Sequence, residues 1–137
     1  MTQRHRIAFA LMMLGVALYA FFHLWKNGWV VWLFIIDLVS MPEYRDFATS
    51  AAIAAFVSLP IAMLGAPCCL PFLSRSRLLH LMLAGFALFD GLCFSALWIF
   101  SDEFRSPPIL VLAMTPFLTL AGILLIKPVE RADIPEN

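Results

Sequence analysis

The chain has 137 residues, of which 63% are hydrophobic and only 13% are charged. Soluble domains carry about a quarter charged and about half apolar residues, so this composition excludes an ordinary soluble domain. Nine basic and nine acidic residues cancel, and we expect no nucleic-acid partner because no basic excess is available to bind one. The length suits a single domain over residues 1–137 and is too short for a helical bundle with a separate soluble enzyme domain.

Four apolar runs are long enough to cross a lipid bilayer as helices. A helix needs about 20 apolar residues to cross the hydrocarbon core, and each run is closed by polar, charged or turn-forming residues. The predicted spans cover approximately residues 7–25, 47–66, 78–100 and 109–126. The sequence therefore predicts an all-α integral membrane protein, built as a bundle of four transmembrane helices.

A fifth apolar run, residues 28–39, has only 12 residues and contains Asp37. As a helix it would reach about 18 Å, which is well short of a hydrocarbon core of about 30 Å. We therefore expect the stretch 26–46 to be interfacial or re-entrant, lying against the outer leaflet or capping the bundle.

The distribution of lysine and arginine predicts the orientation of the four spans. With the N-terminus inside, the inner side carries six of these residues: Arg4, Arg6, Arg75, Arg77, Lys127 and Arg131. The outer side carries three, Lys26, Arg45 and Arg105. A crossing by the short run would abolish this asymmetry, so the positive-inside rule favours four spans with both termini in the cytoplasm. We expect the membrane to be the inner membrane of a bacterium.

Aromatic residues gather on the predicted outer side. All four tryptophans, including Trp98 at the end of the third span, fall at the outer interface in this topology. Apolar anchors at an interface can hold lipid or a protein partner. The predicted outer interaction surface consists of Trp25, Trp29, Trp32, Tyr44 and Arg45.

Small residues recur at spacings of three and four in the second span, and similar residues occur in the third. Membrane helices associate through close packing and polar contacts, so these residues predict close contact between helices of the same chain, with a dimer seam as the alternative. Pro60 and Pro116 lie inside predicted spans and are expected to kink them.

Asp90 lies near the centre of the third span, hence near the predicted bilayer midplane. Ser58, Thr115 and Thr119 fall at a similar depth, and no lysine or arginine does. Two interpretations remain open for this intramembrane polar site. Asp90 is either part of a proton or cation relay, or a neutral acid that hydrogen-bonds hydroxyl groups and holds helices together.

The sequence gives little reason to expect a cofactor or a metal. His23 and His80 lie near opposite ends of their spans, so one haem iron cannot bind both, and two interfacial histidines are the better interpretation. Cys68 and Cys69 are adjacent and could bind a soft metal, but the third cysteine, Cys93, lies deep in another span. A plain interfacial turn explains the pair better, so we expect neither metal nor cofactor.

No catalytic motif is present: the sequence has no phosphate-binding loop, no nucleophile elbow and no metalloprotease motif. We therefore expect a small non-enzymatic membrane protein that acts through protein–protein contacts, as an accessory subunit or an immunity-type protein. Its expected partners are the lipid bilayer and either another membrane protein or further copies of itself. The alternative is a small oligomeric transporter or channel coupled to protonation of Asp90.

Overall fold

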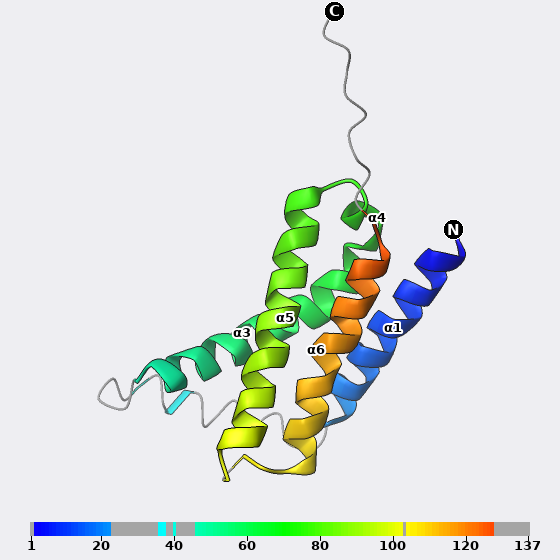
Figure 1. Cartoon of the computed structure of the whole chain (residues 1–137). Coiled ribbons are helices and arrows are strands. Elements are labelled where there is room, and N and C mark those ends of the chain that lie inside the picture. The colour runs from blue at the N-terminus through cyan, green and yellow to red at the C-terminus, as the bar shows by residue number, and fades with distance from the viewer. Residues whose placement is uncertain (1, 23–35, 38–39, 41–45, 103, 128–137) are drawn as a thin grey trace, which may run out of the picture.

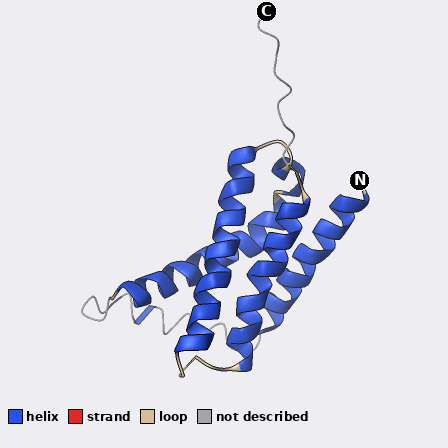
Figure 2. Ribbon diagram, viewed as in Figure 1, coloured by secondary structure: helices blue, strands red, loops and turns tan. Residues whose placement is uncertain are grey.

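The computed structural model describes residues 2–22, 36–37, 40, 46–102 and 104–127. Every regular element in these ranges is helical (Figure 2). The elements are α1 (Gln3–Tyr19), α3 (Phe47–Cys68), α4 (Leu70–Leu73), α5 (Arg77–Phe100) and α6 (Pro107–Leu125). Four of them, all except the one-turn α4, are long and apolar enough to span a membrane. The prediction of an all-helical chain with four such segments is confirmed.

Local sequence fixes where these helices begin. Thr2, Asp46 and Ser76 are the N-cap residues of α1, α3 and α5, and each side chain accepts a hydrogen bond from a backbone N–H in the first turn. The N–H of Thr49 donates to the Asp46 carboxylate over 2.7 Å and holds the pKa of that carboxyl below its usual value. Helix α6 instead begins with proline at its first position, where no backbone hydrogen bond is lost.

The helices α1, α6 and α5 pack in that order, with α6 between the other two (Figure 1). Helix α3 crosses behind α5 and α6 at a slant and packs mainly on α5. Its first turns project away from the bundle, and Ala55 is its first buried residue among the side chains described. The one-turn helix α4 then leads back to α5 at the end of the bundle where α1 begins.

Close packing depends on small residues, although they do not act alone. The buried face of α3 includes Ala55 and Ala62, two of the regularly spaced small residues of the second span, but also the large side chains of Phe56, Leu59 and Met63. The prolines predicted to kink the helices, Pro60 and Pro116, lie inside α3 and α6, and both helices continue through them.

The outside of the bundle carries many large apolar side chains. Large hydrophobic side chains are exposed on all four long helices, among them Leu14, Ile61, Leu92 and Leu124. Water-soluble monomers rarely expose contiguous apolar surface on this scale. This surface, together with the four candidate spans, indicates membrane association.

Candidate functional site: a buried polar layer

Asp90 lies halfway along α5, and its side chain is 0% exposed. Its neighbours Ala87 and Gly91 are also buried and leave room for an adjacent helix. Ser58 of α3 reaches Asp90 with its hydroxyl, and the Ser58 Oγ to Asp90 Oδ1 distance is 2.5 Å. The contact therefore joins the two helices in the interior of the bundle.

The Ser58 hydroxyl lies close to two oxygen atoms. Besides Asp90 Oδ1, the backbone oxygen of Ala55 lies 3.3 Å from Ser58 Oγ. A serine hydroxyl carries one proton and can donate it to only one acceptor, while its lone pairs can accept from another donor. Two arrangements fit these distances. Ser58 donates to Asp90 Oδ1, with the Ala55 oxygen as a longer second contact, or a protonated Asp90 donates to Ser58, which then donates to Ala55.

The second carboxyl oxygen of Asp90 favours the arrangement in which Asp90 is protonated. Oδ2 is buried and has no hydrogen-bond partner among the residues that the structure describes. A buried ion without a full set of partners is far more costly than a neutral polar group in the same place. A neutral acid, with its proton on Oδ1, leaves only a carbonyl-type oxygen at the Oδ2 position.

Thr115 and Thr119 are fully buried on α6. Thr115 Oγ1 donates to the backbone oxygen of Leu112, one turn earlier, over 3.1 Å. Thr119 Oγ1 lies 3.3 Å from the sulfur of Met63 on α3. The four predicted polar residues are thus all buried between helices, but only Ser58 hydrogen-bonds Asp90.

This polar layer lies between two apolar clusters. On α5, Asp90 falls between Ala87, which belongs to one cluster, and Phe94, which belongs to the other. On α6, the two threonines fall between Ala113 and Ile123 in the same way. Large side chains fill the cluster that contains Phe94, where Phe56 and Phe94 stack edge to face with ring centroids 4.7 Å apart. Apolar packing therefore closes the interior on both sides of the layer.

Two residues near the layer, Gly15 and Met63, were not predicted from the sequence, whereas Gly91 is one of the small residues predicted in the third span. Gly15 of α1 lies so close to α6 that a Cβ atom would come within 3.0 Å of Thr119 Oγ1. Met63 provides the sulfur that Thr119 contacts, and Gly91 lies directly under the Phe117 ring. A glycine inside an apolar span could have indicated these close contacts from the sequence, because small residues allow helix backbones to approach closely.

His80, predicted to be interfacial, lies in the first turn of α5 and is only 7% exposed. Its Nδ1 atom has no hydrogen-bond partner within the described part of the chain. His23, the other candidate, lies outside the described residues.

Within the described part of the chain, the cysteines form no metal-binding group with other side chains. Cys68 is exposed, Cys69 and Cys93 are half-buried, and all three are free thiols. Among the residues that the structure describes, no three His, Cys, Asp or Glu side chains come close enough together to hold a metal ion. A metal at Cys68 and Cys69 would therefore need ligands from elsewhere.

The predicted outer interaction surface lies outside the described residues. This holds for all five of its members: Trp25, Trp29, Trp32, Tyr44 and Arg45. The loop between α5 and α6, on the same predicted side, is described except for residue 103.

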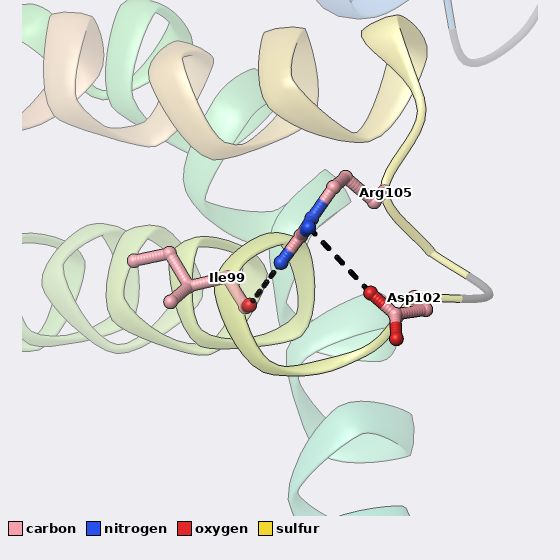
Figure 3. A network of polar contacts seen from close by, with 3 residues as sticks. All are labelled: Ile99, Asp102 and Arg105. Atoms are coloured by element: carbon pink, nitrogen blue, oxygen red, sulfur yellow. Dashed lines mark hydrogen bonds and ion pairs between the residues drawn. The ribbon is translucent and has the colours of Figure 1, made fainter.

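In that loop, Arg105 donates to the backbone oxygen of Ile99 over 2.9 Å and lies 3.5 Å from the Asp102 carboxylate (Figure 3). A cation at this position satisfies a terminal carbonyl of α5 and complements the negative end of the helix dipole. The arrangement stabilises a helix end and contains no reactive group.

Among known proteins, no family model, no curated protein and no solved structure shows significant similarity to this chain.

Proposed function

We propose that this protein is a non-enzymatic integral membrane protein that acts through protein–protein contacts. The observation that carries the proposal is the closed polar layer: Asp90 is fully buried, bonded to Ser58 and enclosed by apolar clusters on both sides. A neutral acid in such a layer holds α3 and α5 together. A polar group in a conducting pathway would instead need contact with water on one side.

Two kinds of interaction protein fit a chain of this size. One is an accessory subunit of a membrane complex. The other is an immunity-type protein that blocks a pore-forming toxin at the outer leaflet. Both need membrane helices, little soluble mass and a recognition surface at one leaflet, and the aromatic residues between the first two spans would provide that surface.

The topology we propose has the four long helices crossing a bacterial inner membrane with both termini in the cytoplasm. To test it, the three native cysteines are replaced and one cysteine is introduced at a time. We expect a membrane-impermeant thiol reagent added to intact cells lacking their outer membrane to label Arg45→Cys. It should leave Arg75→Cys unlabelled until the membrane is permeabilised. The reverse pattern would show that the orientation is inverted.

The proposed recognition surface can be tested by photo-crosslinking in the native membrane. A photoreactive amino acid at position 32 is expected to give a protein adduct of discrete mass. The matched control is position 88, because Leu88 is 44% exposed in the middle of α5 and would face lipid. We expect no protein adduct there. Lipid adducts alone at both positions would contradict a protein-binding role for the aromatic segment.

The second candidate function is a small oligomeric transporter or channel. It is favoured by one observation, the buried Oδ2 of Asp90 without a described partner. Intramembrane acids often mark ion or proton pathways, and four helices would need further copies of the chain to enclose one.

A further inference from the structure

Five cations are exposed at one end of the bundle, which we call the basic end. They come from three separate segments: the start of α1, the turn before α5 together with the first residue of α5, and the residues just after α6. These segments lie at the same end of the bundle in Figure 1. The residues are Arg4, Arg6, Arg75, Arg77 and Lys127.

No acidic side chain that the structure describes lies at the basic end. Asp90 is inside the bundle, Asp102 is at the far end of α5, and Asp46 caps the far end of α3. Asp37 lies in the segment before α3. The single ion pair of the described residues joins Arg105 to Asp102, also at the far end. The five cations therefore have no protein counter-charge in this part of the chain.

Two of the basic residues, Arg4 and Arg77, are not placed where they would stabilise their own helices, whereas Lys127 follows the C-terminus of α6, where a cation is favourable. Arg4 lies in the first turn of α1, Arg77 is the first residue of α5, and neither first turn contains an acid. The N-terminus of a helix is its positive end, where acidic residues are favourable and basic ones are not. Anions from outside the protein would remove this repulsion.

Exposed apolar side chains lie directly beside these cations. Ile7 follows Arg6 and is 47% exposed, and Leu78 follows Arg77 and is 70% exposed. Phe72 of α4, three residues before Arg75, is 55% exposed. A ligand that covers this end must therefore be anionic at its tip and apolar along its length. A free anion lacks the second property, and an acidic soluble peptide lacks an apolar length that runs down the sides of the helices.

We propose that the basic end binds the phosphate headgroups of anionic phospholipids, whose acyl chains then cover the apolar side chains beside the cations. Basic residues at the ends of membrane helices commonly recognise such headgroups. The inference rests on the membrane location proposed above. It does not depend on the protein-contact role, which is tested at the opposite end of the molecule.

The test uses the purified full-length protein in detergent micelles containing equal amounts of phosphatidylglycerol and phosphatidylcholine. Native mass spectrometry then counts the lipids of each kind that remain bound. One cation near an anionic surface contributes about fivefold in affinity, so two engaged cations predict a preference for phosphatidylglycerol of about 25-fold. This preference should weaken as salt is added, because salt screens exposed charges.

Variants identify the residues responsible. Replacing all five cations of the basic end together with glutamine should reduce the preference to about equal binding, while lysine in place of its four arginines should largely keep it. Arg105→Gln removes one cation at the opposite end and is the matched control, with no expected change.

Two results would overturn the proposal: equal binding of the two lipids by the wild-type protein, or an unchanged preference in the glutamine variant. If the glutamine variant does not fold, the salt dependence of the wild-type preference decides, and a preference that salt leaves unchanged contradicts an electrostatic site.

Discussion

Gly122→Ala is expected to destabilise the bundle by about 1–3 kcal/mol, the usual cost of adding a methyl group to a well-packed interface. A Cβ atom on Gly122 would lie 2.8 Å from Met12 Cγ and 2.9 Å from the backbone oxygen of Ala8. The Met12 side chain can move, but the backbone oxygen cannot move without shifting α1. Relief of the clash therefore requires α1 and α6 to separate, which loses contacts along the whole interface.

Gly85→Ala is the matched control, since a Cβ atom on Gly85 would meet nothing within 4 Å. Alanine favours the helix over glycine by up to about 1 kcal/mol, so this variant should be as stable as the wild-type protein or slightly more stable. Reversible unfolding in mixed detergent micelles, followed by circular dichroism, measures both variants. Equal stability of the two would show that α1 does not approach α6 as closely as described.

This interface also shows how far the sequence could predict the fold. Apolar run length predicts that four helices form, because the cost of unpaired backbone groups in lipid permits little else. The helix ends follow from local chemistry, as Asp46 and Ser76 illustrate. The packing order α1, α6, α5 and the slant of α3 could not be predicted. The spacing of small and polar residues along a helix indicates which of its faces is buried, but not which other helix packs on that face.

The polar layer was partly predictable for the same reason. Depth along each helix places Asp90, Ser58, Thr115 and Thr119 at similar levels, but it does not determine which side chains meet. The pairing of Ser58 with Asp90, and of Thr119 with Met63, depends on how α3 is rotated and shifted against its neighbours. Such shifts are set by many small packing contacts, to which the close approach at Gly15 contributes.

Asp90→Leu is expected to destabilise the bundle by at least about 1–2 kcal/mol, because it removes the hydrogen bond between α5 and α3 and places a larger side chain at a fully buried position. Asp90→Asn should stay within about 1 kcal/mol of the wild-type protein, since its amide N–H can donate to Ser58 as the protonated acid does. If Asp90 were instead ionised, asparagine would remove a buried charge with an unpaired oxygen. The Asp90→Asn variant would then be clearly more stable than the wild-type protein. Unfolding in mixed micelles separates these outcomes.

Ser58→Ala shows whether the loss of stability in Asp90→Leu comes from the contact between Ser58 and Asp90. Combined with Asp90→Leu, it should cost less than the sum of the two single changes, and couplings of this kind in membrane helices average about 0.6 kcal/mol. Strict additivity would mean that the two side chains do not interact in the folded protein.

The same Asp90→Asn variant separates the two proposed functions. Wild-type protein reconstituted into vesicles with a pH gradient and an internal pH-sensitive dye should leave the gradient intact if Asp90 only joins helices. A proton-coupled transporter would dissipate the gradient, and Asp90→Asn would stop this because an amide cannot gain and lose a proton during a cycle. A leak that Asp90→Asn abolishes while the fold is retained would overturn the interaction role. If the Asp90→Asn variant folds and still forms the crosslink at position 32, the role of Asp90 is structural: it holds α3 against α5.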